Sequence, residues 1–304
     1  MRAHPPLVVG VDGSEASLRA LDWAADEAAL RGLPLRVVYA SLWERYEGAA
    51  LARDLGGPSG HVAAEDIVRV AGDRARRRRP DLPVTTAVVP EEPEYVLVRE
   101  SRDASVVVVG TRGRSGLADA LLGSVSLTVA TRAHCPVVVI RGNHDNRATG
   151  GGHARIVVGV SDAPTTAVRV ACEEARRREV PLEAVRTWRR PAHETVDHPL
   201  LAGSPERLHE ERAAEELETA LADAPPEVVL HRRTAEGHAR QVLLAASHEA
   251  DLLVIGRRRT GQFGPRLGRV AHTVLHHSAC PVMVVPDEDN TEGRHAAAGR
   301  PHRT

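Results

Sequence analysis

The amino-acid sequence predicts an α/β protein of two tandem doubly wound domains, each a five-stranded parallel sheet with helices on both faces. Short apolar, mostly β-branched runs alternate with longer amphipathic segments, as expected for strands joined by crossover helices. The clearest strand, residues 105–109, contains four consecutive valines and is expected to be buried on both faces. The same order of elements then occurs a second time along the chain, which predicts two similar domains.

Composition restricts the functions open to the chain. Its 304 residues are 42% hydrophobic and 27% charged, enough for two domains of ordinary size. Aromatic residues make up only 2%, so few side chains could stack on unpaired bases, and the net charge of −1 gives no field toward DNA or an anionic membrane. The start of the sequence shows no signal peptide, and no apolar run approaches twenty residues. We therefore expect a cytoplasmic protein with no nucleic-acid or membrane partner.

The first domain, residues 1–142, is expected to contain five strands and four helices. The strands are expected at residues 7–12, 35–42, 84–89, 105–109 and 136–140, and the helices at 15–31, 62–79, 94–102 and 125–132. Ser14 is placed to cap the first helix and Gly32 to end it. The segment 43–60 is expected to be a loop. The arginines at residues 76–79 are interpreted as solvated charge that complements a helix dipole, rather than as a nucleic-acid patch.

The second domain, residues 154–286, repeats the first. Ile156-Val-Val-Gly-Val160 matches Leu7-Val-Val-Gly-Val11, and Asp251-Leu-Leu-Val-Ile-Gly256 matches the valine strand and its glycine. Residues 143–153 are rich in glycine and polar side chains and are interpreted as a flexible linker. Residues 287–304 are expected to form a disordered tail.

The loop after the valine strand has the composition of a phosphate site. Its glycines and the serine that follows them are Gly110, Gly113, Gly123 and Ser124. We expect Gly110 and Gly113 to permit positive φ and the close approach of a ligand to the backbone. The N–H groups of residues 123–125 start a helix, so they lack helical partners and can donate to phosphate oxygens. The hydroxyls of Ser124 and Ser126 add two donors.

This spacing, Gly110, two residues, Gly113, nine residues, Gly123-Ser124, resembles the nucleotide-binding signature of the universal stress protein family. The resemblance covers both halves of the chain and implies the strand order 3-2-1-4-5 in each domain. In such sheets a ligand binds at the switch point, here between the first and fourth strands. The resemblance further implies that the first domain binds ATP, with Mg²⁺ or Mn²⁺ entering only through the phosphates.

The residues implied to contact the nucleotide follow strands one, two and four or start the fourth helix. They are Asp12 and Ala40 for the adenosine part, Val109 and Gly110 for the ribose, and Gly113, Gly123, Ser124, Val125 and Ser126 for the phosphates. Gly13 lies beside Asp12 at the switch point, where Asp12 either contacts adenosine or holds a turn. Arg112 and Arg114 either neutralise phosphate charge or are solvated.

The second domain departs from the signature, so no tight ATP site is expected there. Ser161 stands in place of Asp12, and Arg259 in place of Gly113. Arg269 and Ala271 replace the two serines of the fourth helix. The arginines of this region either hold an anion or, as the sequence favours, are solvated; they are Arg257, Arg258, Arg259, Arg266 and Arg269.

Two histidines of the second domain have the spacing of zinc ligands. His272 and His276 are four residues apart on a predicted helix, with His277 and Cys280 nearby. The sequence places no third ligand beside them, and its three cysteines form no Cys-x-x-Cys pair. No protein-bound metal is therefore predicted.

The resemblance implies an ATP-binding regulatory protein of the stress response, whose occupancy biases a surface or an assembly. The chain contains no lysine, which excludes a Walker-type phosphate loop, and no paired carboxylates accompany the glycine loop. We therefore expect no enzyme, although a slow ATP hydrolase and a ligand-free scaffold remain alternatives. Assembly is implied through the final strands, residues 137–141 and 282–285, either between the two domains or in a homo-oligomer.

Overall fold

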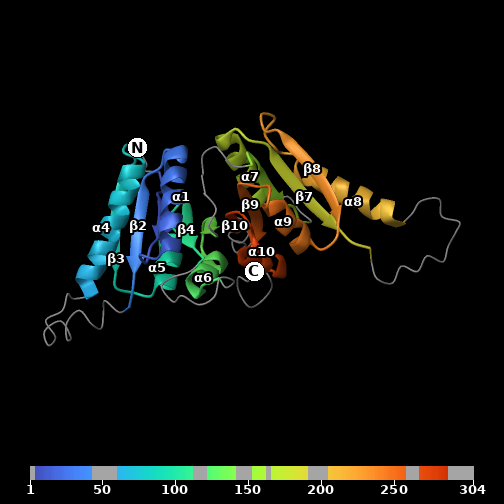
Figure 1. Cartoon of the computed structure of the whole chain (residues 1–304). Helices are drawn as coiled ribbons and strands as arrows, with labels where there is room; N and C mark the ends of the chain where they lie inside the picture. Colours follow the sequence, from blue (N-terminus) through green and yellow to red (C-terminus); the bar gives the residue numbers. More distant parts are fainter. Residues whose placement is uncertain are drawn as a thin grey trace, which may run out of the picture.

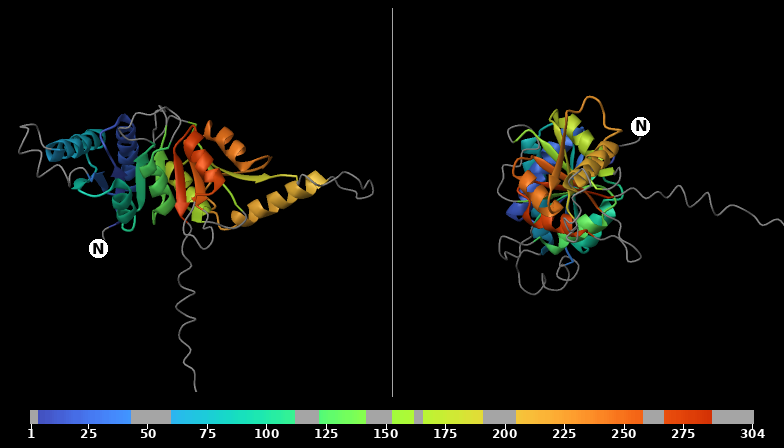
Figure 2. Two further views of the ribbon diagram at one scale, coloured as in Figure 1. Left: turned by 90° about the horizontal axis from the view of Figure 1, so that it is seen from below. Right: turned by 90° about the vertical axis from the view of Figure 1, so that its right-hand side faces the viewer.

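The computed structural model describes residues 4–42, 60–111, 122–141, 153–161, 166–190, 205–257 and 267–286. Two doubly wound halves lie side by side and together form an elongated molecule (Figures 1 and 2). They share one ten-stranded sheet in the order β3-β2-β1-β4-β5-β10-β9-β6-β7-β8. Each half therefore has the expected order 3-2-1-4-5, and within each half all strand pairs are parallel.

The elements alternate along the chain as the sequence predicts. The strands of the first half are β1 (Leu7–Gly10), β2 (Leu35–Ala40), β3 (Val84–Val89), β4 (Val106–Gly110) and β5 (Val137–Ile140). Its helices are α1 (Glu15–Arg31), α4 (Gly60–Arg78), α5 (Pro93–Glu100) and α6 (Ser124–Arg132). The strands of the second half are β6 (Ile156–Gly159), β7 (Leu182–Trp188), β8 (Leu230–Glu236), β9 (Leu252–Arg257) and β10 (Val282–Pro286). Its helices are α7 (Thr166–Arg178), α8 (Pro205–Ala220), α9 (Ala239–Ser247) and α10 (Arg269–His277).

The predicted ends of α1 are confirmed, and so are its caps. The Ser14 hydroxyl accepts from the Ser17 N–H at 3.2 Å, and Gly32 is left-handed with φ 64°. Strands β1 and β2 each end two residues earlier than expected. The expected loop lies outside the described residues, apart from Gly60, which begins α4. The tail and all but the last residue of the linker also lie outside them.

The sheet is covered by two apolar layers. Side chains of α1, α4, α7 and α8 pack on one face, and those of α5, α6, α9 and α10 on the other. The described core is built almost entirely of valine, leucine, isoleucine and alanine, with Trp23 its largest fully buried side chain. None of the described helices is long and apolar enough to span a bilayer.

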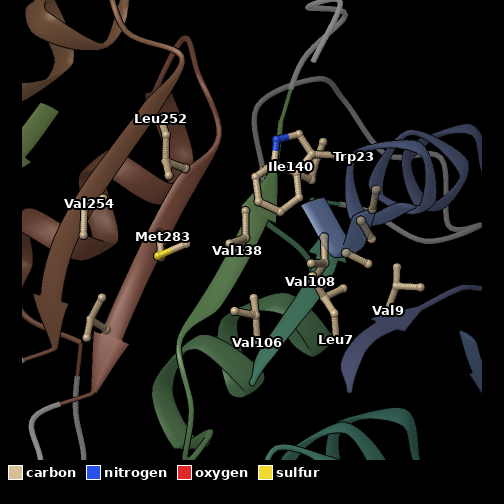
Figure 3. Close-up of a cluster of buried hydrophobic side chains, with 14 of the residues drawn as sticks. Leu7, Val9, Trp23, Val106, Val108, Val138, Ile140, Leu252, Val254 and Met283 are labelled. Atoms are coloured by element: carbon tan, nitrogen blue, oxygen red, sulfur yellow. The ribbon is translucent and has the colours of Figure 1, made fainter. Parts of the chain in front are cut away.

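The two halves meet along β5 and β10, which pair antiparallel. Val138 lies opposite Met283 in this register, and both are fully buried. Figure 3 shows these side chains facing each other between the strands, with Val108 and Ile140 on one side and Leu252 and Val254 on the other. The chain therefore pairs its own two domains, one of the two arrangements that the sequence leaves open.

A buried cluster of charges joins α1 to α7 across the same junction, and sequence analysis missed it. Arg31 contacts Glu27 at 2.5 Å and Glu174 at 2.6 Å, and Arg178 also pairs with both carboxylates. Arg177 contacts Glu174 at 2.6 Å. Burial and the nearby Glu174 raise the pKa of Glu27. Burial alone would raise the pKa of Glu174, but its arginine neighbours lower it below the ordinary value.

The interpretation of the arginine run on α4 as solvated charge was incomplete. Arg78 and Arg79 donate to the carboxylate of Asp26 at 2.7 and 2.8 Å, and the Asp26 side chain is only 3% exposed. Because Asp26 lies on α1, these arginines attach α4 to its neighbour rather than only complementing the dipole of their own helix. Arg78 and Asp26 are 52 positions apart, so no local feature of the sequence indicates that they are in contact.

Candidate functional site

A cavity of about 220 Å³ opens at the carboxyl ends of β1, β2 and β4. This is the switch point between β1 and β4, where a doubly wound sheet binds its ligands. The cavity is bounded by strand ends, by α5 and by the first residues of α6. Its lining residues are Gly10, Val11, Asp12, Ser17, Val38, Ala40, Pro93, Leu97, Val109, Gly110, Gly123, Ser124, Val125 and Ser126.

The start of α6 presents backbone donors to this cavity. The first helical hydrogen bond of α6 runs from the Leu127 N–H to the Gly123 carbonyl, at 3.0 Å. The N–H groups of Ser124, Val125 and Ser126 precede it and lie at the positive end of the helix dipole. The Gly123 N–H, which we expected to donate to phosphate, donates instead to the Thr111 carbonyl at 2.8 Å. The donor set is therefore shifted one residue into the helix.

Gly110 is a glycine for a different reason from the one predicted. Its φ is not positive; the described glycines with positive φ are Gly13, Gly32 and Gly237. A Cβ built on Gly110 would lie 2.7 Å from the Ala16 carbonyl oxygen, inside the first turn of α1. The absence of a side chain therefore lets α1 pack against the end of β4. Gly110 still lines the cavity, but its missing side chain permits the close approach of helix α1 and not, as predicted, that of a ligand.

Asp12 both lines the cavity and holds a turn. Its Oδ1 accepts from the Ser14 N–H at 2.9 Å, which closes the turn between β1 and α1. Gly13, with φ 82°, occupies the left-handed position of this turn and does not line the cavity. The two roles considered for Asp12 are thus compatible, because one carboxylate oxygen makes the turn and the residue stays half-buried at the cavity wall.

The two serine hydroxyls of α6 already have protein partners. Ser126 is buried and donates to the Gly110 carbonyl at 2.5 Å, which ties the end of β4 to the start of α6. Ser124 is exposed and donates to Glu94 on α5 at 3.0 Å. Ser124 could exchange this partner for a ligand, whereas Ser126 serves mainly to shape the site.

Arg112, Gly113 and Arg114 lie outside the described residues. Sequence analysis missed several residues that the structure brings to the cavity, among them Ser17 of α1 and Leu97 of α5. Ser17 is buried, and its hydroxyl donates to the Ser14 carbonyl at 2.8 Å. The predicted strand order could have indicated the strand residue Val38, because its strand neighbours β1. The helix residues required knowledge of how α1 and α5 pack.

The second domain has a larger cavity at the equivalent position, of about 450 Å³. It is lined by Gly159, Val160, Ser161, Val185, Arg186, Thr187, Ala239, Leu243, Ile255, Gly256, Arg257, Gly268, Arg269, Val270 and Ala271. The expected changes Ser161, Arg269 and Ala271 all lie on its wall. Arg258, Arg259 and Arg266 are outside the described residues. The cavity has thus kept its place in the fold while its chemistry has changed.

The histidines of α10 lie close together. The rings of His272 and His276 are 4.4 Å apart between centroids, and Nδ1 of His276 accepts from the Leu122 N–H at 3.4 Å. Within the described part of the chain, no group of three or more histidine, cysteine or acidic side chains is placed to hold a metal ion. Burial raises the pKa of Cys280 to about 12, which disfavours the thiolate that zinc requires.

The fold defines a tandem doubly wound α/β protein with a cavity at the switch point of each half. The family model for the universal stress protein family matches residues 5–141 and 153–286. The chain therefore belongs to the universal stress protein family, in its tandem form.

Known universal stress proteins are similar to this chain over nearly its whole length. Universal stress protein Rv2005c of Mycobacterium tuberculosis is 34% identical over 303 residues, covering 93% of this chain and 97% of that protein. Universal stress protein Rv2623 of the same species is 32% identical over 289 residues, covering 91% and 95%. The crystal structure of a universal stress protein from Archaeoglobus fulgidus has a TM-score of 0.66 at 18% identity, covering 93% of this chain and 98% of that one. This last likeness shows the fold.

Proposed function

We propose that the first domain binds an adenine nucleotide, with ATP as the ligand, and that the chain is a regulatory protein of the stress response. The observation that carries the proposal is the meeting of three features at one cavity. These are the carboxylate of Asp12, the small apolar side chain of Ala40 and the N–H groups at the start of α6. The spacing of the glycines and Ser124 supports the same ligand, because it resembles the nucleotide signature of the family.

Each part of the cavity suits one part of a nucleotide. Val38, Leu97 and Val109 give it apolar walls that would accept a flat base. Its volume of about 220 Å³ is below the range of roughly 300–1,000 Å³ typical of sites that enclose a whole ligand. We therefore assign the cavity to the nucleoside part, with the phosphates at the helix start, where N–H groups and the dipole favour negative charge.

A divalent ion would arrive with the phosphates. Glu94 accepts from Ser124 at 3.0 Å, which places a carboxylate beside the first residue of α6. Carboxylate and phosphate oxygens together are the ligands that Mg²⁺ prefers. Glu94 would then exchange the Ser124 hydroxyl for the ion, which leaves that hydroxyl to the phosphate.

A regulatory role is favoured over catalysis. Asp12 is the one acidic residue among the described residues that line the cavity, and its Oδ1 is engaged in the turn. Hydrolysis would need, besides Glu94 to hold the ion, a group that orients the attacking water, and Asp12, engaged in the turn, is not free to do so. The bound state would instead be detected by partners through conformation or assembly.

The proposal is tested by counting bound nucleotide. The purified chain is denatured, and the released nucleotide is identified by mass spectrometry and quantified per chain. We expect about one ATP per chain, lost in Ala40→Phe, which fills the first cavity. The matched variant Thr187→Phe fills the equivalent place in the second domain and is expected to retain it.

Three results would contradict parts of the proposal. Absence of nucleotide, together with no uptake of added ATP, would favour the ligand-free scaffold. Turnover of ATP that Ala40→Phe removes would favour a hydrolase. Two nucleotides per chain, one lost in each variant, would show that the second domain also binds ATP.

A further inference from the structure

The second half of the chain holds the carboxyl end of α6, the helix whose amino end faces the first cavity. Arg257 is the last residue of β9, and its Nη1 donates to the Thr131 and Ala133 carbonyls, each at 2.8 Å. A helix leaves its last carbonyls without partners of its own, and a cation at this end complements the dipole. The guanidinium of Arg257 thus caps a helix of the other half.

A second contact from the same half lies near the amino end of α6. Nδ1 of His276, on α10, accepts from the Leu122 N–H at 3.4 Å. Leu122 directly precedes Gly123, the residue that caps α6, and its side chain is buried in the same apolar layer as Leu275 of α10. Helices α6 and α10 are neighbours on this face of the sheet (Figure 1). The second half therefore contacts α6 at its carboxyl end and just before its amino end.

The first half holds α10 in turn. Arg141 follows β5, and its Nη1 donates to the Leu275 carbonyl at 3.4 Å, one residue before His276. Beneath these contacts β5 and β10 pair directly. The arrangement of α6 against α10 is thus fixed by side chains that cross the junction in both directions, in addition to the pairing of the strands.

The amino end of α6 is attached to its own half. The Ser126 hydroxyl donates to the Gly110 carbonyl at 2.5 Å, and the Gly123 N–H donates to the Thr111 carbonyl at 2.8 Å. The helix has 9 residues, which is about two and a half turns, so it moves as a short rigid rod. A displacement of its carboxyl end would therefore change the direction of the N–H groups at its amino end.

The residue that makes the crossing contact exists at this strand end in the second half only. Thr111 follows Gly110 as Arg257 follows Gly256, so the two occupy equivalent positions after the fourth strand of their halves. A threonine has neither the length nor the charge to cap a helix across the junction. The half whose cavity departs from the nucleotide signature thus supplies a side chain to the half that keeps it.

We propose that Arg257 is a positioning residue for the nucleotide site of the first half, an inference that rests on the proposed function. It holds the carboxyl end of α6 so that the N–H groups of residues 124–126 stay directed at the phosphates. The nucleoside part of the cavity is built from strand ends and α5, which Arg257 does not contact. Loss of this guanidinium should therefore weaken the binding of phosphates and leave that of the nucleoside unchanged.

The test compares ATP with adenosine by isothermal titration calorimetry on the full-length chain. Arg257→Met keeps an unbranched side chain but removes the charge and the N–H donors. We expect it to weaken ATP binding about three- to tenfold, the usual size of coupling through packed elements, with adenosine unaffected. Arg257→Lys retains the charge and N–H donors and should recover most of the loss. Arg269→Met removes the same charge from the wall of the same cavity and should bind ATP like the wild type.

Three outcomes of the titration would overturn the proposal. Unchanged ATP affinity in Arg257→Met would show that the site does not need the contact. Equal weakening of ATP and adenosine would indicate a general loosening of the fold. Equal weakening by Arg257→Met and Arg269→Met would indicate attraction between distant charges, without a role for α6.

Hydrogen exchange of the ligand-free chain tests the inference separately from nucleotide binding. The Leu127 amide, whose bond to Gly123 begins α6, should exchange faster in Arg257→Met than in the wild type, and at the wild-type rate in Arg269→Met. If the wild-type chain bound neither ATP nor adenosine, the proposed function would fail, and exchange would still decide whether Arg257 holds the start of α6. Unchanged protection of Leu127 in Arg257→Met would overturn the inference whatever the titrations show.

Discussion

Replacing Gly110 by alanine tests whether this glycine is required for the packing of α1 or for ligand binding. A Cβ at this position would lie 2.7 Å from the Ala16 carbonyl oxygen and 2.8 Å from the Ala16 carbonyl carbon. Both are backbone atoms, so no side chain can rotate away and α1 itself must move. The helix is held by Ala20, Leu21 and Trp23, which are all essentially buried in the core.

The equivalent glycine of the second domain provides a matched control. The nearest atom to a Cβ on Gly256 is the Cβ of Ala167 at 3.7 Å, an ordinary contact. Neither Gly110 nor Gly256 has a positive φ, so alanine strains the backbone at neither position. The same substitution at two equivalent strand ends therefore differs only in what the new methyl group meets.

The expected effects on stability have opposite signs. Gly110→Ala overpacks this contact and should lower the free energy of unfolding by about 1–3 kcal/mol, which reduces the folding equilibrium constant roughly five- to over a hundredfold. Gly256→Ala should instead be neutral or raise that free energy by about 0.4–1 kcal/mol, because alanine restricts the unfolded chain. Urea denaturation followed by circular dichroism measures both variants. With Trp43 and Trp188 replaced by phenylalanine, the fluorescence of Trp23, buried in α1, reports any displacement of that helix.

A specific result would refute the packing explanation. If Gly110→Ala unfolded at the same urea concentration as the wild type yet lost its nucleotide, Gly110 would be required by the ligand and not by α1. Equal destabilisation by Gly110→Ala and Gly256→Ala would also contradict it, because the two methyl groups meet such different surroundings.

Two further predictions concern buried ionisable groups. Glu174→Gln should lower the free energy of unfolding by about 3–5 kcal/mol, because it leaves buried arginines without their carboxylate. Glu27→Gln should cost less, since burial and the charge of Glu174 raise the pKa of Glu27 and already disfavour its ionised form; urea denaturation giving equal losses would contradict this order. Burial also raises the pKa of Cys135 and Cys280 to about 12 from an ordinary 9.0. At pH 8 a thiol-specific disulfide reagent should therefore react far more slowly with the folded chain than with the chain in guanidinium. Because the unfolded thiols ionise first, stability should fall as the pH rises from about 9 toward 12; rapid reaction of Cys135 or Cys280 in the folded state would count against their burial.

The sequence was sufficient for features that depend on neighbouring residues. The caps of α1 were predictable because Ser14 and Gly32 act within one turn of the helix that they bound. The tandem repeat and the parallel sheet followed from apolar runs whose spacing is visible along the chain. The start of α6 was predictable for the same reason, because a glycine before a helical pattern marks its first open N–H groups.

The missed features all depend on segments that meet only in the folded chain. Glu27 and Glu174 are 147 residues apart in number, and neither has a local sequence context that indicates a buried carboxylate. Position 110 requires glycine because the backbone of α1, nearly a hundred residues earlier in the chain, packs against it. No pattern of glycines around β4 indicates this contact. Where chemistry depends on packing between distant elements, residue type alone leaves several roles open.

Arg257 shows why the two cavities are not structurally independent. This residue lines the second cavity, and its guanidinium donates at 2.8 Å to the Thr131 and Ala133 carbonyls at the end of α6. The other end of α6 carries the N–H groups of the first cavity. These two contacts satisfy carbonyls that α6 leaves open at its carboxyl end. Substitution of Arg257 should therefore alter both cavities, whereas Arg269 lines the second cavity alone.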